Sequence, residues 1–69
     1  MTNVEELKAM LKEASERFGN VNGDSYMYSL KLFYLTGYMN GVMKAEKMSV
    51  NFTEMCDLLT YKTELLKEE

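Results

Sequence analysis

The sequence predicts an all-α protein, a small three-helix bundle that can also be described as a helical hairpin with an additional N-terminal helix. The chain has no proline and only four glycines, so few residues interrupt helix formation. Apolar residues recur at spacings of three and four over most of the chain. Residues that cap helices precede three apolar segments, at Thr2 or Asn3, at Asp24 or Ser25, and at Asn51.

The length of the chain limits how it can be stabilised. Its 69 residues form one domain, residues 1–69, and a domain this small has a thin stability margin. A single cysteine, Cys56, excludes an intramolecular disulfide, and the absence of histidine excludes the usual zinc sites. Close helix packing or self-association therefore has to supply the stability.

The first helix is expected over residues 3–18. Thr2 with Glu5, or Asn3 with Glu6, gives a capping box at its start. Spacings of three and four place five apolar residues on one stripe: Val4, Leu7, Leu11, Ala14 and Phe18. The segment 19–24, "GNVNGD", ends this helix, with Gly19 suited to a left-handed conformation and Asn22-Gly23 to a turn.

The second helix is expected over residues 25–48. It is apolar on most sides, and Lys31 is the only charged residue between Tyr26 and Met43. A helix of this kind is buried on most sides, so we expect it to be the central helix of the bundle. Its polar residues form one narrow stripe: Ser29, Thr36, Asn40, Lys44 and Lys47.

The third helix is expected over residues 51–66. Asn51 and Glu54 form an N-cap and N3 pair at its start. The predicted buried stripe consists of Phe52, Met55, Leu59 and Leu66, widened by Leu58 and Leu65. Cys56 lies beside this stripe, and we expect a partly buried, inert thiol there.

Two glycines interrupt the most apolar segment, "LFYLTGYMNGVM". Gly37, Gly41 and Ala45 follow one another at four-residue spacing, so they line one face as a shallow groove, although each glycine costs about 0.5–1 kcal/mol in a helix interior. Three interpretations stay open. Another helix of the same chain packs in the groove, the same face of a second subunit packs there, or the segment spans a membrane. A span would have to extend from Tyr26 to Met43, and Lys31 near the middle of that stretch argues against it.

The charges and the reactive side chains exclude several function classes. The net charge is −3, and residues 49–69 hold five acidic and two basic side chains. Without a basic cluster, direct binding to nucleic acid is not expected. Without histidine, no catalytic base of the usual kind accompanies a nucleophile, and we expect no catalytic residue, no metal site and no cofactor. The charged, amphipathic N-terminus does not have the pattern of a secretory signal, which favours a cytoplasmic protein.

Five tyrosines and seven methionines are many for so short a chain. Tyrosine is favoured at interfaces, where one end of the side chain is buried and the other is wet. We therefore expect surplus apolar surface on the second helix and a homodimer formed through it. The expected interface, for packing within the chain or between chains, consists of Tyr34, Gly37, Tyr38, Gly41 and Ala45.

Residues 34–59, "YLTGYMNGVMKAEKMSVNFTEMCDLL", resemble a pattern found in short proteins encoded by tailed phages and other mobile elements. In that pattern a helix with Tyr and two Gly runs through a tight turn into a second helix. The resemblance covers less than half of the chain. It implies an accessory protein that binds and blocks a host factor, including a defence system, and it implies no specific functional residue.

Two functions are therefore expected from the sequence. The first is a non-enzymatic interaction protein, without a membrane span, whose partner is a host or phage protein. The alternative is an oligomer that binds a small ligand or nucleotide, in a pocket between subunits lined by tyrosines and by lysines such as Lys31 and Lys44.

Overall fold

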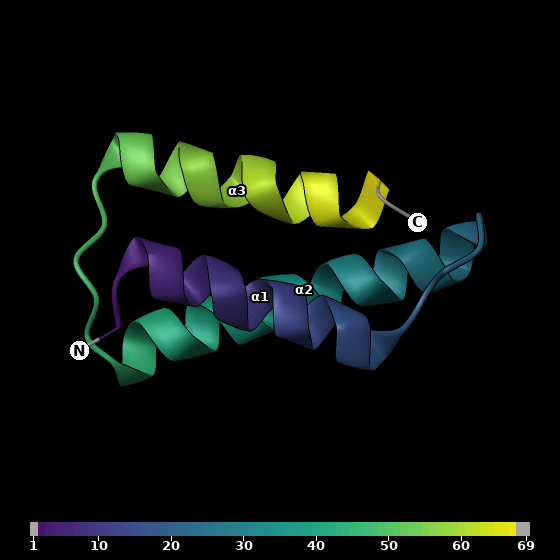
Figure 1. The fold of residues 1–69 in the computed structure, drawn as a ribbon, viewed down its shortest axis with the longest axis horizontal. Coiled ribbons are helices and arrows are strands. Elements are labelled where there is room, and N and C mark those ends of the chain that lie inside the picture. Colours follow the sequence, from purple (N-terminus) through teal and green to yellow (C-terminus); the bar gives the residue numbers. More distant parts are fainter. Residues whose placement is uncertain (1, 68–69) are drawn as a thin grey trace.

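The computed structural model describes residues 2–67, which fold into three helices. The helices are α1 (Val4–Phe18), α2 (Ser25–Ala45) and α3 (Phe52–Lys67). In Figure 1, α1 and α3 run in the same direction, and α2, which lies between them in the sequence, runs in the opposite direction. The prediction of an all-α three-helix bundle is confirmed, and no further helix precedes α1 in the described part of the chain.

Short polar side chains begin each helix by accepting the first backbone N–H groups. The Asn3 side chain accepts a hydrogen bond of 2.8 Å from the N–H of Glu6, so the start at Asn3 rather than Thr2 is the one adopted. Asp24 caps α2 by accepting from the N–H groups of two residues in its first turn. At α3, Asn51 accepts from the N–H of Glu54 at 2.8 Å and the Glu54 carboxylate accepts from the N–H of Asn51 at 3.1 Å. The predicted capping box at α3 is confirmed.

The connection between α1 and α2 is the turn that the sequence predicts. Gly19 ends α1 with a φ of 97°, and Asn22 and Gly23 have φ values of 50° and 76°. The N–H of Asp24 donates to the carbonyl oxygen of Val21 at 2.9 Å, which closes a four-residue turn with two positive φ values at its centre. Asparagine and glycine are the residues that such a turn favours.

The α2 helix ends at Ala45, three residues before the predicted end at Met48. Lys47 has a φ of 52°, a left-handed conformation that stops the helix. The N–H of Lys47 donates to Lys44 at 3.2 Å, and the N–H of Met48 donates to Met43 at 2.9 Å. These two bonds form a Schellman motif, which satisfies carbonyl groups in the last turn of α2.

The core is built from leucines of all three helices together with one alanine and one methionine: Leu7, Leu11, Ala14, Leu35, Met39, Leu58, Leu65 and Leu66. The predicted stripe of α1 therefore faces the core. The central helix is α1 rather than the predicted α2, because α1 packs extensively on both other helices whereas α2 and α3 contact each other least. Only one side of α2 is covered as a result, which leaves much of its apolar surface exposed.

Two buried lysines lie among these apolar residues. Lys31 of α2 is fully buried, and Lys62 of α3 is 7% exposed. The Lys62 ammonium donates a hydrogen bond of 2.8 Å to the Thr36 hydroxyl, which in turn donates to the carbonyl oxygen of Leu32 at 2.8 Å. A buried cation requires an acceptor, and the Thr36 hydroxyl provides it for Lys62. The resulting chain of hydrogen bonds joins α3 to α2.

Candidate interaction surfaces

The side of α2 that is turned away from the bundle carries a row of exposed apolar residues. Its two most exposed side chains are Tyr26 at 70% and Phe33 at 73%. At helical spacing they share this side with further residues, and together the seven form what we call the α2 outer face: Tyr26, Leu30, Phe33, Tyr34, Gly37, Gly41 and Ala45. All seven are exposed in the described chain.

The position of the α2 outer face follows from what α2 buries. Lys31, Leu35 and Met39 are its buried residues, spaced four apart on the opposite side of the helix. The first turns of α2 also extend beyond the ends of the other two helices (Figure 1), and every residue from 25 to 30 is exposed. The bundle therefore covers the inner side of α2 and leaves the first turns and most of the outer side bare, whereas the Tyr34 ring also contacts Phe18 of α1.

No other helix of the chain occupies the groove at the two glycines. A Cβ atom added at Gly37 or at Gly41 would meet nothing within 4 Å. Neither α1 nor α3 therefore packs into the groove, and the first interpretation drawn from the sequence, packing within the chain, is wrong. The small residues lie in the exposed half of α2, where they are open to a molecule outside this chain.

The residues expected at the interface are partly brought together. Tyr34, Gly37, Gly41 and Ala45 lie on the α2 outer face, whereas Tyr38 is half-buried and packs against the core. The Tyr34 ring lies between the rings of Phe18 and Tyr38, with centroid distances of 5.5 and 6.4 Å. Sequence reasoning missed three residues of the face, although their spacing of three to four from Gly37 and from one another could have found them: Tyr26, Leu30 and Phe33.

A second exposed apolar surface lies on α3. Phe52 is 84% exposed and Leu59 is 42% exposed, and both share the outer side of α3 with the exposed Cys56. We call these three residues the α3 outer face. The predicted burial of Leu58, Leu65 and Leu66 is confirmed. The prediction that Phe52 and Leu59 are buried is wrong, as is the prediction of a partly buried Cys56, because these three residues are exposed.

The lysines named for a ligand pocket do not meet. The Lys31 ammonium donates a hydrogen bond of 2.8 Å to the carbonyl oxygen of Gly19 and lies 6.0 Å from the centroid of the Phe18 ring. Burial lowers the pKa of Lys31. Lys44 is exposed near the other end of α2, about 20 Å away along a helix that rises about 1.5 Å per residue. A pocket containing both lysines therefore does not exist within one chain.

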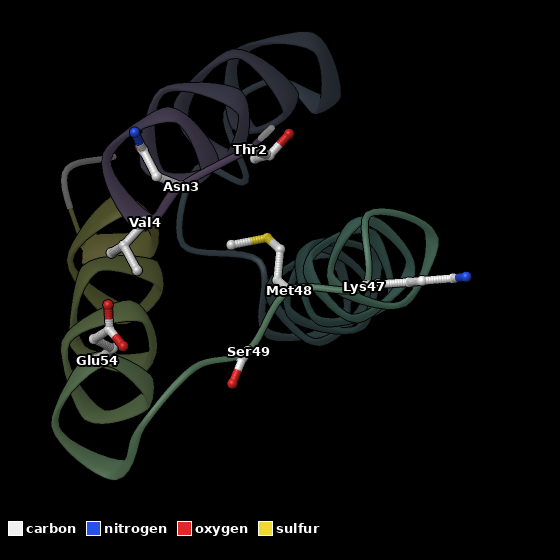
Figure 2. A pocket seen from close by; sticks show the side chains of 7 residues that line it. All are labelled: Thr2, Asn3, Val4, Lys47, Met48, Ser49 and Glu54. Atoms are coloured by element: carbon white, nitrogen blue, oxygen red, sulfur yellow. The ribbon is translucent and has the colours of Figure 1, made fainter.

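A shallow pocket of about 310 Å³ lies where α1 and α3 begin and α2 ends. Figure 2 shows its lining residues, with the side chain of Lys47 pointing outward, away from the others. Two helix N-termini at one place would favour an anion. Here, however, Asn3 and Asn51 already accept from N–H groups of these helices, and the Glu54 carboxylate brings negative charge. The pocket is therefore poorly suited to a phosphate group.

The structure offers no other arrangement with evident chemistry in residues 2–67. No three acidic or cysteine side chains among them lie close enough together to hold a metal ion. None of the described helices has both the length and the hydrophobicity that crossing a membrane requires.

Comparison of the chain with protein-family models, with curated proteins and with solved structures gave no match. The α2 outer face and the α3 outer face are therefore identified as candidate interaction surfaces from the geometry of this chain alone.

Proposed function

We propose that this chain is a non-enzymatic interaction protein that binds a host protein and alters its activity, as a phage or mobile-element accessory protein would. The observation that carries the proposal is the exposure of eight large hydrophobic side chains in a 69-residue chain. Six of them lie on α2 and two on α3. Exposed apolar surface on this scale is typical of proteins that bind other macromolecules.

The two outer faces allow two kinds of contact. The two faces lie on different helices, α2 and α3, and both are exposed, so a partner on one leaves the other accessible. We assign the α2 outer face to self-association, which gives a homodimer, and the α3 outer face to the host protein.

The α3 outer face suits a partner with a hydrophobic pocket and a basic rim. Phe52 stands at the start of α3 and is the most exposed of the large hydrophobic residues, so it is the natural anchor residue. The exposed carboxylate of Glu64 lies along the same helix, whereas that of Asp57 is paired with Lys8 of α1 at 2.5 Å. Residues 49–69 carry five acidic and two basic side chains. Opposite charge at the rim of an interface speeds association and selects the partner.

Site-specific photo-crosslinking in host cells tests this assignment. A photoreactive residue at position 52 or 59 should capture one and the same protein, whereas a residue at the exposed position 16 of α1 should not. Phe52→Ser should abolish capture by the probe at position 59, with the helical circular dichroism signal unchanged. The purified target should then change its activity when the chain is added. Equal capture at positions 16 and 52, or a target whose activity the chain leaves unchanged, would contradict the proposal.

The alternative of a nucleotide-binding oligomer has a separate test. A nucleotide at one hundred times its dissociation constant stabilises the protein by about 2.7 kcal/mol. We expect no change in the melting temperature with a panel of nucleotides, because Lys31 is engaged inside the chain. A clear upward shift with one nucleotide would favour the alternative.

A further inference from the structure

The α2 outer face is divided into a bulky half and a small half. Towards the N-terminus it presents Tyr26, Leu30 and Tyr34, which are spaced four apart, with Phe33 beside them. Towards the C-terminus it presents Gly37, Gly41 and Ala45, also spaced four apart. The face therefore has protrusions at one end and a groove of matching period at the other.

This division makes the face complementary to itself when two copies run antiparallel. In such a pair, the numbers of two residues that lie across from each other add up to the same sum everywhere along the interface. Tyr26 with Ala45, Leu30 with Gly41, and Tyr34 with Gly37 all give the same sum. One register therefore places three bulky side chains above three small residues, twice over by the two-fold symmetry.

We propose that a second copy of this chain covers the α2 outer face, with the two α2 helices antiparallel and in the register that pairs Leu30 with Gly41. The proposal rests on the homodimer part of the proposed function and specifies its geometry. In a parallel pair, by contrast, bulky residues would meet bulky residues and the groove would meet the groove.

The charges at the ends of α2 favour the same arrangement. Asp24 precedes the helix, and Lys44, Glu46 and Lys47 stand at its end, all exposed, so this end carries a net positive charge. The proposed register brings Asp24 of one copy to the end of α2 in the other copy, where Lys44 lies in the last turn. It also places the positive end of each helix dipole beside the negative end of the other. Lys31, the only charge between these ends, is buried on the inner side of α2 and is not desolvated by the partner.

The exposed area suits a small, weak interface. Aromatic side chains bury about 150–250 Å² each, so the exposed parts of Tyr26, Phe33 and Tyr34, with that of Leu30, amount to roughly 400 Å² in each copy. Two copies would bury roughly 800 Å², which is in the range of weak, transient protein–protein contacts. Measurements therefore belong at protein concentrations of tens of micromolar, where a weak dimer of this size is populated.

Disulfide crosslinking between single-cysteine variants tests the orientation and the register. In a Cys56→Ser background, Leu30→Cys and Gly41→Cys are made separately and oxidised alone or mixed. We expect a covalent dimer only in the mixture, because each introduced cysteine lies across from the other variant's cysteine. The Gly41 position accepts a Cβ without a clash inside the chain. A control mixture of Leu30→Cys with Lys12→Cys, which lies exposed on α1, should stay monomeric on a non-reducing gel.

Each other outcome has a definite meaning. Efficient crosslinking of one variant alone would show another antiparallel register or a parallel pair, and crosslinking of both variants alone would show a parallel pair. Either result would overturn the proposal, while leaving the homodimer itself in place. A monomeric mass of the unmodified chain by light scattering at tens of micromolar would overturn both the proposal and the homodimer. Neither outcome bears on the binding of a host protein through α3, so the failures are distinguishable.

A pair of substitutions tests the size match without chemical crosslinking. Gly41→Leu should leave the circular dichroism spectrum helical, because its side chain enters open space in the single chain, but it should split the dimer by striking Leu30 of the partner. Leu30→Ala in the Gly41→Leu background should restore the dimer, because a large side chain at position 41 then lies across from a small one at position 30. A Gly41→Leu chain that remains a dimer, or a double variant that remains a monomer, would contradict the register.

Discussion

The ammonium of Lys31 donates a hydrogen bond of 2.8 Å to the carbonyl oxygen of Gly19, the residue that ends α1. The contact ties α2 to the end of the preceding helix. It also places a positive charge at the negative end of the α1 dipole, where a cation is favoured. Burial nevertheless works against the charged form of this side chain, and the outcome is a lowered pKa.

The lowered pKa of Lys31 predicts how the free energy of unfolding depends on pH. In the unfolded chain the ammonium is solvated and keeps its ordinary pKa of 10.5. Between the lowered pKa and 10.5 the unfolded chain therefore binds more protons than the folded chain, and the contribution of Lys31 to stability rises with pH. We expect the wild type to gain stability relative to Lys31→Met as the pH is raised through this window, measured by urea unfolding.

The comparison with Lys31→Met removes the contributions of the other titrating groups. Every other ionisable side chain is common to both proteins. A difference in unfolding free energy that stays flat or falls with rising pH would mean that Lys31 is not desolvated in the folded chain.

The contact between Lys62 and Thr36 predicts an unequal effect of removing either partner. Thr36→Val removes the acceptor and leaves the ammonium of Lys62 without that hydrogen bond, which should cost about 1–3 kcal/mol. Lys62→Met removes the buried charge as well, so we expect a change within about 1 kcal/mol. In the Lys62→Met background, Thr36→Val should then cost clearly less. Urea unfolding of the four proteins gives the coupling energy, and a Thr36→Val penalty that is the same in both backgrounds would show that the two side chains do not interact.

The end of α2 predicts a stabilising substitution. Lys47 adopts a φ of 52° in the Schellman motif, a conformation that costs most residues free energy and that glycine adopts readily. Lys47→Gly should therefore raise the free energy of unfolding by about 0.5–1 kcal/mol. Lys12→Gly, at an exposed position inside α1, is the matched control and should lower it by about 1 kcal/mol. Thermal unfolding followed by circular dichroism distinguishes the two signs, and a loss of stability in both variants would contradict the left-handed assignment.

Local signals in the sequence predicted the parts of the fold that local interactions determine. The Asn51–Glu54 capping box and the Asn22-Gly23 turn involve residues within a few positions of one another, so their pattern is enough to place them. The end of α2 escaped prediction because a lysine rather than a glycine occupies the left-handed position. The apolar spacing also continues past it to Met48, which packs against the core from outside the helix.

Interactions distant in the sequence decide the rest. The burial of Lys31 depends on a carbonyl group twelve residues earlier, which is in place only once the turn has formed. The orientation of α3 depends on which of its two apolar sides fits against α1. Because Lys62 is polar, its side of α3 looks exposed in the sequence, yet Thr36 provides the acceptor that allows this lysine to be buried. The candidate interface on α2 was located in part, since Gly37, Gly41 and Tyr34 are on the exposed side and Tyr38 is turned inward.

The orientation of α3 itself is testable with two adjacent leucines. Leu58 is fully buried in the core, whereas Leu59 is 42% exposed on the α3 outer face. Leu58→Ala should cost about 2–5 kcal/mol, which is a large part of the stability of a domain this small. Leu59→Ala should change the free energy of unfolding by less than about 1 kcal/mol, because the side chain loses little burial. Both variants have the same change in composition and helix propensity, so the difference between their urea midpoints reports burial alone. Equal losses, or a larger loss at Leu59, would mean that α3 is rotated about its axis towards the side that the sequence pattern favours, with Phe52 and Leu59 in the core.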